Sequence, residues 1–195
     1  MWIDSHCHLD APEFEPDRDQ VWQAAQAAGV QQLLIPAIGL ENCHAVDACC
    51  RRYPGCAPAY GIHPLYVGQA SEADLAGLAE RLQRQPPVAV GEIGLDGHTQ
   101  EVDLARQEFF FVAQLKLARE RQLPVVLHVR QAVDQVLKHM RRIPVPGGIA
   151  HAFNGSEQQA QQYIDLGFKL GFGGMLTFER SNKIRHLAKV ISLEH

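Results

Sequence analysis

The sequence lacks the features of a membrane-spanning or secreted protein. It has no run of about eighteen apolar residues, which excludes a transmembrane helix. Residues 1–6 include Asp4 and no lysine or arginine, unlike the basic start of a signal peptide. Positive charge is not in excess, because 18 Lys and Arg face 22 Asp and Glu, for a net charge of −4. Broad wrapping of duplex nucleic acid is therefore excluded, although a cation bound in a cleft would still permit a local phosphate site.

A disulfide framework is missing as well. The cysteines are five in number and no two have C-x-x-C spacing: Cys7, Cys43, Cys49, Cys50 and Cys56. We interpret them as free thiols, and we expect a cytoplasmic protein with no membrane partner. Histidine, by contrast, is plentiful, with ten residues.

What the chain does contain is a repeated unit, an apolar run followed by a helical stretch. Most runs are rich in Val, Ile, Leu or Ala, which is typical of strands buried on both faces of a parallel sheet. Predicted strands cover residues 2–6, 33–38, 57–62, 88–93, 125–129, 148–153 and 168–173. Predicted helices cover residues 17–28, 41–52, 72–85, 102–122, 131–142, 156–166 and 181–191. On the longest helix we expect an apolar stripe through Phe109, Val112, Leu115 and Leu117.

Seven such units predict one α/β domain over residues 1–195, either a doubly wound open sheet or a (β/α)₈ TIM barrel. A barrel needs eight strands, so a barrel here is incomplete. Its first and last strands would keep unpaired edges. Direct closure would distort the strand tilt. We therefore expect self-association through the open edge, or cover by the helix over 181–191.

Histidines follow the first predicted strand at a spacing that suits a metal. Residues i and i+2 of a strand point to the same face, so His6 and His8 can bind one ion while Cys7 points away as a packed thiol. The H-x-H pattern alone also fits two ordinary histidines.

Three further strands end in metal-ligand residue types. Glu92 lies between Gly91 and Gly94 in an apolar run, where a buried carboxylate requires an ion partner or a metal. His128 ends the fifth predicted strand and His151 belongs to the sixth. Each could singly be an ordinary core residue, and Glu92 could pair with Arg130.

Taken together, these residues favour a metal site, because barrel enzymes build their sites at the carboxyl ends of the strands. Four histidines and one carboxylate suit one or two divalent cations such as Zn²⁺ or Mn²⁺. Glu92 is then the residue to bridge two metals, which would activate a water and stabilise the leaving oxygen of an ester.

His63 and Arg130 have the chemistry of substrate contacts. His63 follows the third predicted strand, and Pro64 fixes the loop beside it. Arg130 lies two residues after His128, so both point to the same side, and a guanidinium binds a phosphate or carboxylate with two hydrogen bonds. The alternatives are a loop histidine and an ion pair at the strand end.

These motifs resemble those of the TatD family of metal-dependent hydrolases, in particular its YjjV-like branch. The matching segments occur in order along the chain: IDSHCHLD at 3–10, YGIHP at 60–64, VGEIGLD at 90–96, LPVVLHVR at 123–130, HAFNGS at 151–156 and GFGGMLTF at 171–178. The resemblance implies a (β/α)₈ barrel, a divalent metal site with Zn, Mn or Mg, and hydrolase activity, with DNase action known in the family.

The resemblance also assigns roles to residues of this chain. It implies that the metal ligands are His6, His8, Glu92, His128 and His151. Glu92 is the implied bridge and catalytic residue. His63 and Arg130 are the implied phosphate contacts, and Asp96 and Asn154 are implied to support the ligands from behind.

One family element has no counterpart here. Family members continue into an eighth strand carrying Glu-Thr-Asp-Ala-Pro, whose Asp binds metal and accepts the proton of the attacking water. This chain stops before that strand, and residues 193–195 fit either a native continuation or an expression-tag remnant. We expect the shortened chain to be slower than a complete relative, by about 10²-fold, because a general base typically contributes that much.

Three functions remain open on these residues. The first is a metal-dependent phosphodiesterase acting on DNA or a small phosphodiester. The second is an amide, ester or lactone hydrolase on the same metal centre, because one fold hosts many chemistries. The third is a shortened, low-activity form that binds metal or phosphate.

Overall fold

The computed structural model describes residues 2–99, 101 and 103–195, and it alternates strands with helices as predicted. The strands are β1 (Trp2–Asp4), β2 (Val30–Pro36), β3 (Cys56–Tyr60), β4 (Ala89–Asp96), β5 (Val125–Arg130), β6 (Gly148–Ala150) and β7 (Phe168–Leu170). The helices are α1 (Arg18–Ala27), α2 (Cys43–Arg52), α3 (Glu72–Arg84), α4 (Leu104–Arg121), α5 (Val133–Arg142), α6 (Glu157–Asp165) and α7 (Asn182–Val190). Two short 3₁₀ turns that we did not predict are η1 (Pro12–Phe14) and η2 (Gly174–Thr177).

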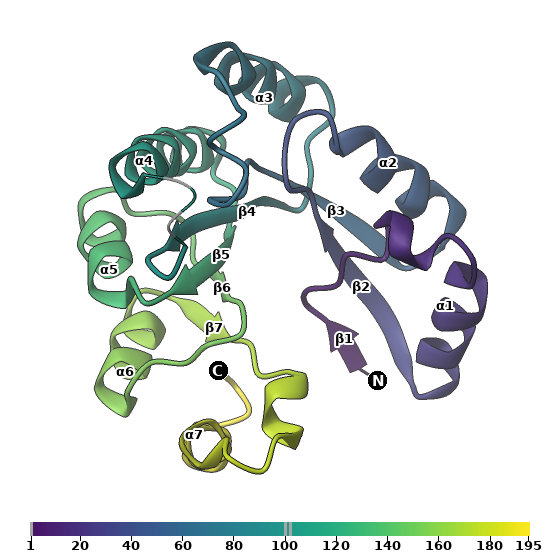
Figure 1. The fold of residues 1–195 in the computed structure, drawn as a ribbon, viewed down its shortest axis with the longest axis vertical. Helices are drawn as coiled ribbons and strands as arrows, with labels where there is room; N and C mark the ends of the chain where they lie inside the picture. The colour runs from purple at the N-terminus through teal and green to yellow at the C-terminus, as the bar shows by residue number, and fades with distance from the viewer. Residues whose placement is uncertain (1, 100, 102) are drawn as a thin grey trace.

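The strands form one parallel sheet in the order in which they occur in the chain, from β1 to β7. The sheet curls, and α1 to α6 lie around its outer face (Figure 1). A doubly wound sheet would reverse its strand order and carry helices on both faces, so the sequential order confirms the barrel prediction. The carboxyl ends of all the strands consequently meet at one mouth.

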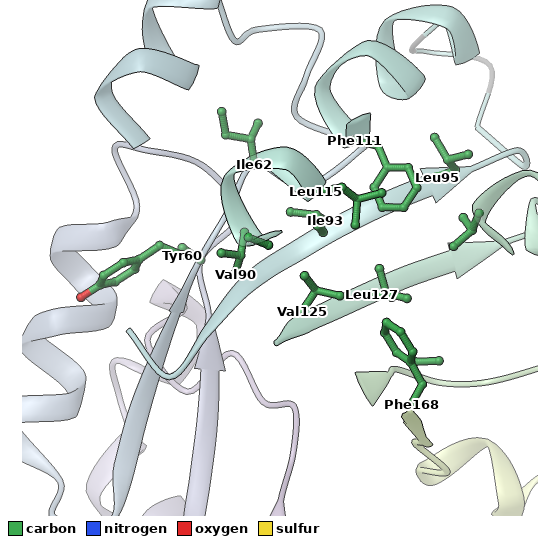
Figure 2. Packing of buried hydrophobic residues seen from close by; sticks show 14 of the residues in the cluster. Tyr60, Ile62, Val90, Ile93, Leu95, Phe111, Leu115, Val125, Leu127 and Phe168 are labelled. Carbon is green, nitrogen blue, oxygen red and sulfur yellow. The ribbon is translucent and has the colours of Figure 1, made fainter. Parts of the chain in front are cut away.

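Two layers of apolar side chains hold the curled sheet. The larger core lies between sheet and helices and includes Val90, Leu115 and Leu127 (Figure 2). A smaller cluster on the opposite strand face contains Leu34, Ala59, Ala89 and Val126. Since successive strand residues point to opposite faces, strands that contribute to both layers are apolar throughout, and β4 is buried along its whole length.

The face that helix α4 turns to the core agrees in part with the one we predicted. Its buried residues are Gln107, Phe110, Phe111, Gln114, Leu115 and Ala118, whereas Phe109 is 49% exposed. Leu115 is buried as predicted, Val112 and Leu117 are partly buried and pack against the core, and only Phe109 of the predicted stripe is wrong. The inner face also includes the two buried glutamines, which we did not predict. The predicted start of this helix, residue 102, lies outside the described residues. In the described part of the chain, no helix combines the length and apolarity needed to cross a membrane.

The two edges of the sheet are β1 and β7, which do not pair with each other. β1 is an exposed edge, as predicted for the first strand of an incomplete barrel, because Trp2 is 70% and Ile3 58% exposed. The prediction that the helix over 181–191 covers this edge is wrong for β1, because α7 lies apart from β1 (Figure 1) and leaves Trp2 and Ile3 exposed. On the β7 side, the backbone N–H of Leu170 donates to the carbonyl of His195.

Candidate metal centre

Glu92 is the centre of the site and lies inside β4, where its side chain is 2% exposed. The ladder between β4 and β5 is irregular between Val90 and Ile93, so the strand deviates where Glu92 sits. Gly91 allows β4 to come close to Val126 of β5, because a Cβ at position 91 would stand only 2.6 Å from the Cβ of Val126. The backbone N–H of Glu92 donates to the carbonyl of Ala37, beyond the end of β2 (3.0 Å). The predicted close approach at this glycine is therefore one of backbone to backbone.

Two histidines from the first unit reach one oxygen of Glu92. The strand β1 ends at Asp4, two residues earlier than predicted, so both histidines lie in the segment that follows it. Even so, Nε2 of His6 is 3.0 Å and Nε2 of His8 is 3.5 Å from Oε2 of Glu92. The two Nε2 atoms are 3.3 Å apart, while Cys7 packs against the apolar core. The geometry predicted for the H-x-H pair is thus retained outside the regular strand.

The other oxygen of Glu92 faces His63 and His128. Nδ1 of His128 is 3.0 Å and Nε2 of His63 is 3.5 Å from Oε1 of Glu92. Two groups of potential ligands therefore share Glu92: His6 with His8, and His63 with His128. His63 therefore lies among the potential metal ligands around Glu92, whereas the sequence predicts it as a substrate contact.

Asp96, which the resemblance implies to support the ligands, lies beside His128. Its Oδ2 is 3.0 Å from Nε2 of His128, and its Oδ1 accepts hydrogen bonds from the backbone N–H groups of His98 and Thr99. The backbone N–H groups hold one oxygen of the Asp96 carboxylate, and the other oxygen holds the imidazole of His128 in place. Such a partner sets the tautomer and ring orientation of a ligating histidine.

His151, Arg130 and Asn154 lie at the edge of the cluster. The ring of His151 stacks on that of His6, with the centroids 3.5 Å apart. His128, His151, Arg130 and Asn154 line one cavity of about 420 Å³, together with Met175 of η2. The side chain of Arg130 is exposed, and Glu92 has histidines as its ion partners among the described residues, so the alternative pairing of Glu92 with Arg130 is not formed.

The charge state of the cluster follows from these contacts. Burial opposes ionisation of Glu92, but its bonds to His128, His6, His63 and His8 hold the pKa of the carboxyl well below its usual value. Burial lowers the pKa of His63 and outweighs its contact with Glu92. Burial, together with repulsion from His6, lowers the pKa of His151 to about 4. The site is therefore an ionised carboxylate among imidazoles, two of which stay neutral at neutral pH.

Two buried glutamines of α4 hold the backbone on which the site is built. Gln114 accepts a hydrogen bond from the N–H of Ile62 (2.7 Å) and donates to its carbonyl (3.1 Å), directly before His63. Gln107 accepts from the N–H of Asp96 (2.7 Å) and donates to its carbonyl (3.1 Å). The sequence signal for both was weak, since glutamine on a helix usually faces solvent. The one signal is that both glutamines lie three and four residues from Phe110 and Phe111, which places them on the same face of the helix.

The residues present fit a divalent cation. The donor set combines one carboxylate with several imidazoles, which borderline cations such as Zn²⁺ and Mn²⁺ prefer. In addition, Nδ1 of His6 is buried and has no hydrogen-bond partner within the described residues. It is Nε2 of His6 that faces Glu92, so the unpaired Nδ1 lies on another side of the ring, and the fit to a cation rests on the donor set around Glu92.

A parallel sheet of sequential strands, with a carboxylate among histidines at its mouth, defines a metal-dependent hydrolase of the barrel type. The chain belongs to the TatD family, because the family model described as TatD related DNase matches residues 3–195. The resemblance inferred from the sequence motifs is thereby confirmed.

Relatives with names and solved structures support the same assignment. The chain is 39% identical over 195 residues to the Escherichia coli protein named metal-dependent hydrolase YjjV, covering 98% of this chain and 75% of that protein. It is 35% identical over 192 residues to a Cronobacter sakazakii protein named 3'-5' ssDNA/RNA exonuclease TatD, covering 97% and 73%. The crystal structure of YjjV superposes with a TM-score of 0.93 over 98% of this chain and 75% of that one.

Proposed function

We propose that this chain hydrolyses phosphodiester bonds at the end of single-stranded nucleic acid. The observation that carries the proposal is Glu92, a buried carboxylate contacted by four histidines beside a cavity that Arg130 lines. Relatives of the chain named ssDNA/RNA exonucleases support the choice of substrate. The five thiols, free among the described residues, support a reducing, cytoplasmic setting.

The proposed cofactor is one or two divalent cations of Zn, Mn or Mg. His6, His8, Glu92, His128 and His151 are the proposed ligands, and the structure adds His63 as a further candidate. When bound, a divalent cation polarises a phosphoryl oxygen and lowers the pKa of water. Glu92 contributes the negative charge that binds such a cation, and its two oxygens face different groups of histidines.

His63 has a defined place for its proton. Its Nδ1 accepts a hydrogen bond from the backbone N–H of Leu65 (3.1 Å), so the neutral ring carries its proton on Nε2. That atom points toward Glu92 and His128 and can donate a hydrogen bond to an anionic oxygen bound there. This tautomer favours the proposed phosphate contact over metal ligation through Nε2.

Arg130 and Asp96 complete the proposed machinery. The guanidinium of Arg130 has two parallel N–H donors that match the oxygens of a phosphate, and it lines the same cavity as His128. Asp96 holds His128 in position through Nε2. Asn154, which the sequence predicts to support the ligands, lines the cavity with Arg130 and is proposed to contact the substrate backbone.

Two substitutions separate metal binding from phosphate binding. Glu92→Gln should lose bound metal and nearly all release of nucleotides from 3'-labelled single-stranded DNA. Arg130→Ala should keep its metal content and raise KM for DNA by about tenfold or more, since charged hydrogen bonds contribute about 1.5–3 kcal/mol. Arg142→Ala, an exposed arginine on α5, is the matched control and should change neither quantity.

Each outcome has a clear meaning. Full DNA hydrolysis by Glu92→Gln would remove Glu92 from the mechanism. Turnover of neutral amides or lactones without release of nucleotides would instead support the alternative hydrolase on the same centre. Metal content is measured by elemental analysis of the purified protein, and therefore does not depend on activity.

A further inference from the structure

Two cavities adjoin the residues of the candidate metal centre, on different sides of the mouth. One, of about 420 Å³, is the cavity lined by Arg130 and described above. The other, of about 380 Å³, lies beyond the ends of β2 and β3 and is lined by Ile38, Leu40, Ile62, Tyr66 and Ala70 among others. We call it the β2–β3 cavity. Both volumes are in the range of small-molecule sites, about 300–1,000 Å³.

The β2–β3 cavity is joined to the site through His63. The ring of Tyr66, which lines the cavity, meets the ring of His63 edge-on with the centroids 5.9 Å apart. The backbone N–H of His63 donates to the carbonyl of Ile38, which also lines the cavity (3.0 Å). A group bound in this cavity would therefore lie next to a phosphate held by His63.

The charges of the two cavities differ in sign. The β2–β3 cavity is lined by Glu41 and Asp74, and no Lys or Arg is among the described residues that line it. The other cavity has Arg130 and no acidic residue in its described lining. A polynucleotide carries a negative charge at every phosphate, so its chain is favoured on the Arg130 side. The acidic lining of the β2–β3 cavity disfavours a phosphate, so of the parts of a nucleotide it is the uncharged base that this cavity accepts.

Tyr66 has the exposure needed to bind such a group. Its side chain is 42% exposed although it lies beside a buried histidine, and the apolar side chains of Ile38, Leu40 and Ile62 surround the same space. Bases stack on exposed aromatic rings irrespective of sequence, because every base has a π-face. The polar amide of Asn42 is engaged with Asp10 and with the N–H of Ile38.

We infer that the β2–β3 cavity binds the terminal nucleobase of the substrate against Tyr66, while the rest of the strand lies on the Arg130 side. This inference rests on the proposed function and adds the direction in which the strand is bound. It also predicts little preference among the four bases, because stacking supplies the main contact. Cleavage between the two cavities would release a single nucleotide.

Binding of small ligands to the Mn²⁺-loaded chain tests the inference without requiring turnover. Thymidine 5'-monophosphate carries a base at the sugar carbon where 2-deoxyribose 5-phosphate carries a hydroxyl, and calorimetry gives the Kd of each. The wild-type chain should bind the nucleotide about tenfold more tightly, as expected for one stacked base. Tyr66→Ala should remove this difference, whereas Tyr66→Phe, which keeps the ring, should retain it. Phe109→Ala, an exposed aromatic on α4, is the control and should leave both affinities unchanged.

The outcomes distinguish failure of the inference from failure of the proposed function. If the sugar phosphate binds but the base adds nothing, or if Tyr66→Ala keeps the tenfold difference, the inference is overturned and the phosphate site stands. If neither ligand binds to the wild-type chain, the proposed phosphate site and the inference fail together. Loss of the preference in Tyr66→Ala with unchanged affinity for the sugar phosphate supports both.

Discussion

The side chain of Gln114 bonds both backbone groups of Ile62, accepting from its N–H at 2.7 Å and donating to its carbonyl at 3.1 Å. A buried helix side chain thus takes the place that a neighbouring strand would occupy just past the end of β3. The same amide also donates to the carbonyl of Phe110, one turn earlier in α4. Gln114 thus fixes from behind the segment that carries His63, whose own backbone N–H is bonded to the carbonyl of Ile38.

Gln114→Met should therefore lower the free energy of unfolding by about 2 kcal/mol, because the buried N–H and carbonyl of Ile62 would lose their partners. Urea unfolding measures the change. Gln161→Met on the exposed face of α6 is the control and should have little effect. A wild-type unfolding curve for Gln114→Met would show that solvent replaces the amide without cost.

Metal should stabilise the fold as well as enable chemistry. A ligand that binds only the folded chain at a hundred times its Kd raises the unfolding free energy by about 2.7 kcal/mol. Thermal unfolding with Zn²⁺ and with a chelator should show this shift for the wild-type chain and not for Glu92→Gln. Glu108→Gln, whose carboxylate pairs with His139 away from the site, should keep the shift. An equal shift in all three proteins would place the cation elsewhere.

Asp96 should influence metal affinity without touching the metal. Asp96→Asn keeps the shape of the side chain but removes the charge beside Nε2 of His128. Loss of such a partner typically weakens metal binding by about 10- to 100-fold. Titration with Zn²⁺ against a competing chelator gives the affinity. Unchanged affinity would mean that His128 is not a ligand or needs no orientation.

The start of α3 should respond to pH. The carboxylate of Asp74 accepts hydrogen bonds from the backbone N–H (2.6 Å) and hydroxyl (2.8 Å) of Ser71, and these bonds lower its pKa from 3.8. Because the pKa of Asp74 is lower in the folded chain than in the unfolded chain, these bonds stabilise the folded chain fully when the pH is above the ordinary pKa of 3.8. This stabilisation is lost as the pH falls through the pKa that Asp74 has in the folded chain. Asp74→Ala should therefore lower the free energy of unfolding at pH 7, because the capping box at the start of α3 loses one of its two side chains.

The cost of Asp74→Ala should shrink as the pH falls below 3.8 and through the lowered pKa that Asp74 has in the folded chain. Urea unfolding at several pH values gives the comparison. Glu80→Ala, in a largely exposed pair with Arg84, should show no such trend. A cost that stays constant with pH would mean that the charge of Asp74 does not matter.

The open edge of the sheet should promote self-association. Trp2 and Ile3 are 70% and 58% exposed on an edge strand, whose free N–H and carbonyl groups can pair with another strand. We expect light scattering to show a mass above that of the monomer, and Ile3→Lys to reduce it. Phe109→Lys, which replaces an exposed apolar residue far from the edge, should leave the mass unchanged. A monomeric wild type at high concentration would contradict this.

The sequence predicted the strands well because apolar runs and helix-ending Gly and Pro are local signals. It also predicted which residues would converge: Glu92 and the histidines gather because carboxyl ends of parallel strands meet at one mouth. The sequence did not predict which of these histidines contact Glu92 directly. His63 lies within 3.5 Å of Glu92, whereas His151 stacks on His6, and neither arrangement follows from position in the chain.

Tertiary contacts account for the remaining differences. The strands β6 and β7 have three residues each, shorter than predicted, because the chain leaves the sheet before the apolar run ends. The buried face of α4 includes Gln107 and Gln114, whose partners are backbone groups of distant residues. A helical pattern read for apolar residues alone cannot include them, and it therefore selected the exposed Phe109.

The sequential order of the strands also determines when the site forms during synthesis. Each strand pairs with its neighbours in the chain, so the sheet can grow one unit at a time as the polypeptide emerges from the ribosome. His6 and His8 are made first but have no carboxylate to face until β4 is in place. His128 arrives a unit later, with β5. His151 follows β6. A cation that needs all of the proposed ligands would thus be captured late, after six of the strands are in place, and cannot guide the earliest steps.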